Sequence, residues 1–181
     1  MEQLPDGISI TPAATEPDRR ATHRFIERYI PLEPTAIPAL NVDGLYDPVI
    51  LTARATTGGM VGALLACRPR VAVAMSMLGP AADPGSKVME LDLLAVDASR
   101  RRSGIGSSLL RACGAALEEK GARILFGGVT DASTSPQVAS FYRDAGYAVL
   151  ADGQHLPPFL GRTWVMPFTE GPVFWFWKRI A

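Results

Sequence analysis

Hydrophobic positions follow two different periods along the chain, and each period predicts one kind of element. Short, nearly continuous or alternating apolar runs bounded by turn residues indicate strands. We expect them at 7–12, 49–55, 60–67, 88–96, 123–130, 147–151 and 172–180. Apolar residues spaced three and four apart indicate amphipathic helices. These are expected from the cap at Thr15 to Pro31, over a short segment at 36–40, from about 103 to Gly121, and at 136–145.

The segment 68–87 has no clear period. Its apolar part, 71–78, precedes the turn residues Gly79-Pro80 and Asp83-Pro84-Gly85. It is compatible with a loop containing a helical turn, or with an extra strand.

The most informative stretch runs from 88 to 121. A buried strand at 88–96 is followed by Arg100, Arg101 and Arg102, by two glycines, and then by a helix. The first N–H groups of a helix have no partner inside it, and the helix dipole adds positive potential there. Glycines let a ligand approach the backbone, and arginines attract phosphate. Residues 101–107 are therefore a candidate cradle for a pyrophosphate.

Three anion-binding motifs compete for this loop. A P-loop requires a Gly-Lys pair, which the chain lacks. A dinucleotide fingerprint requires a third glycine where Leu109 stands, and a much shorter turn after the strand. The remaining pattern, [RQ]-x-x-G-x-[GA], fits Arg101-Arg102-Ser103-Gly104-Ile105-Gly106 at every position. This loop resembles motif A of the GCN5-related N-acetyltransferase (GNAT) superfamily.

Two further stretches strengthen the resemblance. Leu93-Leu94-Ala95-Val96-Asp97 is similar to the family's strand before the loop, and Phe141-Tyr142-Arg143-Asp144-Ala145-Gly146-Tyr147 is similar to motif B. The resemblance implies an α/β chain with the GNAT (acyl-CoA N-acyltransferase) fold, in which helices flank a mixed, twisted sheet. It also implies a single domain spanning 1–181. The order of the predicted elements agrees with that fold.

The resemblance further implies that acetyl-CoA is the co-substrate. The residues expected to bind it are the strand positions that pair with the pantetheine arm, the loop and one residue before motif B: Leu94, Ala95, Val96, Arg101, Arg102, Ser103, Gly104, Ile105, Gly106, Ser107 and Ser135. Ser135 stands where many members have an asparagine, and its reach is shorter.

Transfer of an acetyl group to an amine needs a base and an acid. Glu90 is the candidate base, because many members carry a glutamate on this strand. Burial would raise its pKa from about 4.3 toward a useful range. Asp92, on the same face of the strand, is the weaker alternative, and both carboxylates could simply lie on a wetted patch. Tyr142 is the candidate acid, with a structural place in an apolar core as its alternative.

Composition narrows the class of protein. The chain has 181 residues, with 18 Lys+Arg against 18 Asp+Glu, so its formal net charge is zero. Nothing here resembles a nucleic-acid-binding surface, a secretory signal or a membrane span, and a cytoplasmic enzyme is expected. Cys67 and Cys113 do not form a disulfide framework, and no metal spacing appears. A homodimer stays open, because the aromatic run at 174–177 could face both sides of a sheet.

The resemblance places the acceptor between the segments 31–48 and 152–170. These segments are mildly acidic, because Arg162 is their single arginine or lysine against Glu33, Asp43, Asp47, Asp152 and Glu170, and they also carry the aromatic residues Tyr46, Phe159, Trp164 and Phe168. We therefore expect a small primary amine, cationic before reaction and with some apolar bulk, with a wide cleft for an antibiotic or a cleft for a peptide tail as the alternatives. A non-catalytic acyl-CoA-binding module of the same fold is the alternative function. A nicotinamide-dependent oxidoreductase is disfavoured by the missing glycine.

Overall fold

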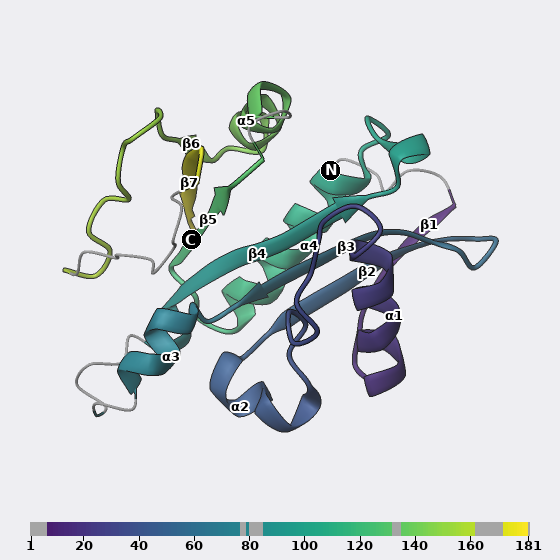
Figure 1. Ribbon diagram of the computed structural model, residues 1–181, viewed down its shortest axis with the longest axis horizontal. Helices are drawn as coiled ribbons and strands as arrows, with labels where there is room; N and C mark the ends of the chain where they lie inside the picture. Colours follow the sequence, from purple (N-terminus) through teal and green to yellow (C-terminus); the bar gives the residue numbers. More distant parts are fainter. Residues whose placement is uncertain (1–6, 77–78, 80–84, 132–134, 162–171, 181) are drawn as a thin grey trace. The chain divides into compact units, whose positions relative to one another are not determined.

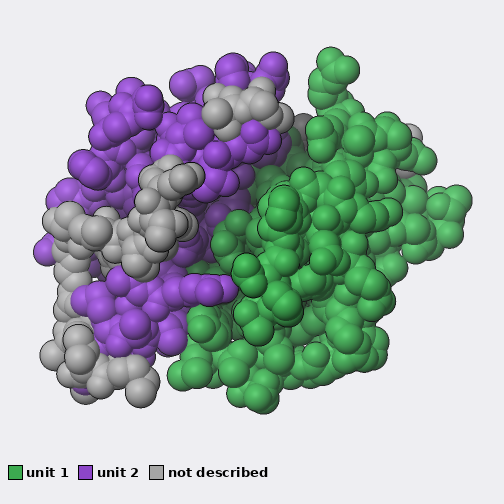
Figure 2. All heavy atoms as spheres, viewed as in Figure 1, with its two compact units in different colours: residues 1–67, 92–117 green, residues 68–91, 118–181 purple. Residues whose placement is uncertain are grey.

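The computed structural model describes residues 7–76, 79, 85–131, 135–161 and 172–180 (Figure 1). The chain forms one mixed seven-stranded sheet in the order β1-β2-β3-β4-β5-β7-β6. It divides into two compact units, shown in Figure 2: unit 1 is 1–67 with 92–117, and unit 2 is 68–91 with 118–181. The predicted single domain over 1–181 stays a prediction. None of the helices formed by the described residues is long and apolar enough to cross a membrane.

Unit 1 is built on three antiparallel strands. They are β1 (Ile8–Pro12), β2 (Val49–Ala55) and β3 (Met60–Cys67). The turn between β2 and β3 uses Gly58 at a φ of 87°, a left-handed conformation that favours glycine. Both strands of this hairpin begin and end at the predicted residues.

Helices cover both faces of β3 within unit 1. Its odd-numbered residues, Ala63 and Leu65, pack with Phe25 and Ile26 of α1 (Glu16–Ile26). On the opposite face, a Cβ at Gly62 would lie only 2.9 Å from Ile105 Cγ2, which begins α4 (Ile105–Glu119). This alternation follows from the two-residue period of a strand. It fixes the first turn of α4 directly against β3.

The beginning of α1 agrees with the bounds predicted from the sequence, whereas its end does not. The Thr15 hydroxyl oxygen accepts a hydrogen bond from Asp18 N at 3.3 Å and caps the helix. The helix ends at Ile26, four residues before Ile30, and a turn follows in which Ile30 N donates to Ile26 O. Tyr29 therefore lies in a turn rather than on a helical stripe.

The short helix predicted at 36–40 is wrong. The structure instead has η1 (Leu40–Val42) followed by α2 (Asp43–Tyr46). Ile37 precedes a proline, which disfavours helical backbone. The Pro38 carbonyl accepts a hydrogen bond from Arg19 Nη1 at 2.8 Å, so it is held by a side chain of α1.

Unit 2 contains the aromatic strand β7 (Phe174–Arg179) between β5 (Ile124–Val129) and β6 (Ala148–Val149). β7 pairs antiparallel with both neighbours, and β5 pairs parallel with the start of β4 (Val88–Val96). Trp175 and Trp177 pack on one core cluster, which includes Phe126 and Phe159. The aromatic run therefore packs within its own unit on this face.

The ambiguous segment at 68–87 resolves as helical where it is described. It contains α3 (Arg70–Ser76) and η2 (Gly85–Lys87), so the extra strand is not present in those residues. The helix α5 (Ser135–Asp144) is followed two residues later by Gly146, which has a φ of 82°. The strand predicted at 88–96 is observed with the same bounds, and the remaining predicted elements differ from the observed ones by at most two residues at either end, where boundaries are least defined.

Candidate functional site

The loop that follows β4 is a short series of tight turns. Asp97 begins it and caps η3 (Ala98–Arg100): its carboxylate accepts from Ser99 N at 2.9 Å and from Ser99 Oγ at 2.6 Å. Ser103 Oγ then donates to Arg100 O at 2.5 Å. These local hydrogen bonds give residues 97–103 a defined path toward the helix.

The helix α4 begins directly at the end of this loop. Ser108 N donates to Gly104 O at 2.9 Å, which is the first bond of the helical ladder. The N–H groups of Ile105, Gly106 and Ser107 therefore have no carbonyl partner inside the helix. Gly104 has a φ of 83°, which a residue with a side chain adopts only at a cost. The glycine is thus required by the backbone as well as by the approach of a ligand.

The arginines of this loop face solvent. Arg100, Arg101, Arg102 and Ser103 are exposed, while Gly104, Gly106 and Ser107 are half-buried. Arg102 is left-handed, with a φ of 61°, which is uncommon for a long side chain. Strained backbone of this kind is concentrated at ligand-binding sites. The chemistry of the loop, with outward N–H groups and flexible guanidinium groups, fits a pyrophosphate.

The strand β4 presents two kinds of environment along its length. Glu90 is buried, with 9% of its surface exposed, whereas Asp92 is exposed. The register with β5 joins Val88, Met89 and Glu90 to residues 124–126 and ends there, while β4 continues to Val96. Leu94 and Val96 are half-buried and Ala95 is buried. The two candidate bases are therefore distinguishable by their solvation.

Tyr142 lies in the aromatic core of unit 2. Its ring stacks on Phe176 with centroids 3.7 Å apart and planes 14° apart, and Phe141 and Tyr147 meet it edge-on. Only 6% of its surface is exposed. Burial, with a smaller contribution from Tyr147, raises the pKa of the phenol well above 10. The hydroxyl is thus fully protonated at neutral pH, but losing its proton costs more than it would in water.

The last predicted cofactor residue, Ser135, is the first residue of α5. Its side chain lies outside the described part of the structure. Glu90, Ser135 and Tyr142 belong to unit 2, whereas the loop and Leu94–Val96 belong to unit 1. The structure therefore describes the two sets separately.

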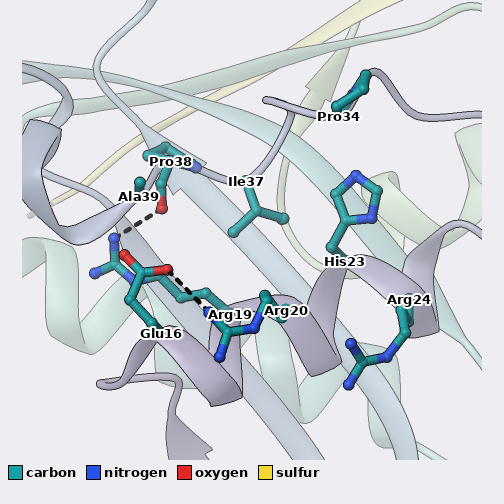
Figure 3. A pocket seen from close by; sticks show the side chains of 9 residues that line it. All are labelled: Glu16, Arg19, Arg20, His23, Arg24, Pro34, Ile37, Pro38 and Ala39. Carbon is teal, nitrogen blue, oxygen red and sulfur yellow. Dashed lines mark hydrogen bonds and ion pairs between the residues drawn. The ribbon is translucent and has the colours of Figure 1, made fainter.

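A pocket of about 320 Å³ lies in unit 1 between α1 and the segment 34–39 (Figure 3). Arg19 is one of its lining residues: the side chain is buried and its guanidinium pairs with both carboxylate oxygens of Asp43, at 2.6 and 2.7 Å. Arg20 lies 4.0 Å from Glu16. Because two of its arginines already face carboxylates, the pocket carries no strong excess charge that would identify a ligand.

These contacts revise the acidic surface expected for the acceptor. Asp43 is engaged by Arg19, and Phe159 is buried among Phe126 and Trp177. Both are structural. Glu33 and Asp152 are exposed, while Arg162, Trp164, Phe168 and Glu170 lie outside the described residues.

Comparison with known proteins agrees with the motifs. A family model described as an acetyltransferase (GNAT) domain matches residues 58–149, which is just over half of the chain. None of the curated proteins compared with the sequence matches it.

Solved structures share the fold at low sequence identity. A GNAT-family acetyltransferase from Staphylococcus aureus Mu50 is 18% identical, with a TM-score of 0.65 over 96% of this chain and 99% of its own. An aminoglycoside 6′-N-acetyltransferase in complex with coenzyme A is 18% identical, with a TM-score of 0.61 over 96% and 97%. Tetrahymena GCN5 is 11% identical, with a TM-score of 0.61 over 96% of each chain.

Proposed function

The chain belongs to the GNAT acetyltransferases, and from this premise we propose that it transfers an acetyl group from acetyl-CoA to a primary amine of a small molecule. The amine nitrogen bonds to the thioester carbonyl carbon, the carbon–sulfur bond breaks, and the products are an amide and the coenzyme A thiol. The observation that carries the proposal is the backbone of the loop, with its left-handed Gly104 leading into the first turn of α4.

Acetyl-CoA supplies the activated acetyl group and two linked phosphates by which it is held. We assign the pyrophosphate to the N–H groups at the start of α4, with Arg101 and Arg102 adding charge. The pantetheine arm is assigned to the β4 backbone at Leu94–Val96, beyond the part of the strand that pairs with β5. Ser135 is assigned a weaker contact with the cofactor.

Glu90 is the proposed base. A buried carboxylate is a stronger base than one in water, since desolvation disfavours its charged form. Glu90 is buried and Asp92 is exposed, so the burial of the two residues favours Glu90. Its role is to accept, directly or through a water molecule, the proton that the ammonium group must lose.

Tyr142 is the proposed acid, which protonates the departing thiolate. The stacking on Phe176 restricts its ring, and its protonated state makes a proton available. The raised pKa works against this role, because a better donor would have a pKa closer to the thiol value of about 8.5.

The acceptor is proposed to be a small cationic amine. Support comes from the exposed carboxylates Glu33 and Asp152, one from each segment expected to hold the acceptor. The engagement of Asp43 by Arg19 reduces the acidity of this surface, so the preference for cationic acceptors is expected to be moderate.

One observation favours a second function. Tyr142 is packed like a core residue, as it would be in a non-catalytic acyl-CoA-binding module of the same fold. A thiol-release assay with a panel of primary amines, alcohols and carboxylates separates the two functions. Saturable release with amines supports the enzyme. Binding of acetyl-CoA without release on any acceptor favours the module, and exclusive use of neutral or anionic acceptors contradicts the proposed substrate class.

A further inference from the structure

Tyr29 lies just beyond the end of α1, and its ring is fixed on several sides. Its centroid is 5.4 Å from that of Phe25, and the Arg28 guanidinium lies 5.5 Å above the ring. Its backbone N–H donates to Ile26 O at 2.8 Å, which holds the turn. The side chain is half-buried and leaves one polar group, the hydroxyl, to be satisfied.

That hydroxyl donates to Asp97 Oδ2 at 2.9 Å, across 68 residues of sequence. Asp97 uses its other carboxylate oxygen to hold Ser99, and its backbone N–H donates to Val61 O of β3 at 2.9 Å. Asp97 is therefore the point where β4, β3, α1 and the loop are joined within unit 1. Hydrogen bonds from Ser99 and Tyr29 lower the pKa of its carboxyl group, and burial together with Asp97 raises the pKa of Tyr29.

The far end of the loop is held by packing instead. Ile105 and Leu109 are buried and lie against Gly62, where a Cβ would approach them to 2.9 and 3.0 Å. Between the two fixed ends, residues 98–103 are exposed and include the left-handed Arg102. The conformation of this stretch therefore depends on how firmly the preceding residue, Asp97, is oriented.

We propose that Tyr29 is a positioning residue for acyl-CoA: its hydroxyl orients Asp97 and thereby keeps the loop in the conformation that binds pyrophosphate. This inference rests on the proposed function of the loop. Tyr29 acts through Asp97 and does not itself touch the cofactor. Without the hydroxyl, the binding-competent fraction of the loop falls, and the apparent Kd rises in inverse proportion.

The test is Tyr29→Phe, which removes one oxygen and keeps the packed ring. Calorimetry is expected to give a Kd for acetyl-CoA about five- to tenfold higher than wild type, the scale of one lost ordinary hydrogen bond. The KM for acetyl-CoA rises by the same factor, while kcat at saturating acetyl-CoA stays within about twofold, because a bound cofactor restores the loop. Tyr46→Phe is the matched control for cofactor affinity, since Tyr46 packs on the same core cluster as Tyr29.

A double-mutant cycle identifies the route of the effect. If Tyr29 acts through Asp97, Tyr29→Phe adds little to the Kd of Asp97→Ala, which has no side-chain acceptor for the Tyr29 hydroxyl, whereas independent contributions multiply. The inference would be overturned if Tyr29→Phe left the Kd unchanged, if the effects of the two substitutions on Kd multiplied in the double variant, or if kcat fell by the same factor as the affinity. Each of these results would leave the proposed function standing. If wild type itself does not bind acetyl-CoA, it is the proposed function that fails.

Discussion

The loop of unit 1 and the Tyr142 cluster of unit 2 hold their polar groups in opposite ways. The loop is exposed, and what it offers a ligand is mostly backbone, held in place by side chains such as Asp97. In the cluster around Tyr142 the polar groups are the phenols of Tyr142 and Tyr147, and the Tyr142 phenol is surrounded by rings. The exposed backbone of the loop is suited to binding a large anion. The buried phenol of Tyr142 is suited to keeping one hydroxyl protonated away from water. Substitutions in the two regions should therefore separate binding from turnover.

The largest expected effect is the loss of binding in Gly104→Asp. A side chain at a φ of 83° costs about 1–2 kcal/mol, and a carboxylate beside the pyrophosphate loses further charge-assisted hydrogen bonds. We expect the Kd for acetyl-CoA to rise about 1,000-fold, which corresponds to about 4 kcal/mol. Gly114→Asp makes the same change in α4 at an open position and should leave the affinity unchanged. Comparable affinities in the two variants would place the cradle elsewhere.

Glu90→Gln should have the next largest effect, and on turnover rather than binding. Loss of a general base typically lowers kcat by about 100-fold or more, and acetyl-CoA affinity should stay within about twofold. The pH–rate profile should also lose its acidic limb. Asp92→Asn is the paired variant, since it makes the same change at the exposed position. If Asp92→Asn lowers kcat more than Glu90→Gln does, the role of base belongs to Asp92.

Tyr142→Phe should lower kcat by about tenfold, which is a smaller fall than that expected for Glu90→Gln. The reason is that a thiol with a pKa of about 8.5 is a good leaving group as the thiolate, even when no acid protonates it. Affinity for acetyl-CoA should be nearly unchanged. Tyr147→Phe removes a hydroxyl from the same aromatic cluster and is the control. An equal fall in kcat in the two variants would assign Tyr142 a packing role and favour the non-catalytic module.

The smallest effect concerns stability at alkaline pH. Burial raises the pKa of Tyr142, so keeping this phenol neutral stabilises the folded state fully below about pH 10. That contribution is lost as pH rises from about 10 toward the higher folded value, at about 1.4 kcal/mol per pH unit. Urea unfolding at several pH values above 9 should show a shallower decline in the free energy of unfolding for Tyr142→Phe than for wild type. Parallel declines would mean that Tyr142 is not buried as described.

The glycine turn and the start of α4 were predictable because the residues that specify them are close in sequence. A strand, a run of arginines and two glycines before an amphipathic helix specify a helix N-terminus with an open approach. Even the cap formed by Asp97 on Ser99 could have been read from the Asp-x-Ser spacing. The hydroxyl of Tyr29 could not, because no local pattern indicates a partner 68 residues away.

One error has a local cause, and the others come from contacts that are distant in sequence. The helix expected at 36–40 ignored the restriction that Pro38 places on Ile37, and the pairing of Arg19 with Asp43 then organises the segment differently. Asp43 and Phe159 are residue types expected on an acceptor surface, but Asp43 pairs with Arg19 and Phe159 is buried in the core. Resemblance to the family makes Tyr142 and Glu90 candidates for the acid and the base, whereas the burial of Tyr142 depends on residues distant in sequence, including Phe176 on β7.

The central claim is that residues 101–107 bind the pyrophosphate of an acyl-CoA, and calorimetric titration of the wild-type protein with acetyl-CoA tests it most directly. The account predicts saturable binding that NAD, titrated in parallel, does not reproduce. A folded protein that gives neither heat nor a shift in melting temperature with acetyl-CoA would contradict it, because any ligand that binds only the native state must stabilise that state.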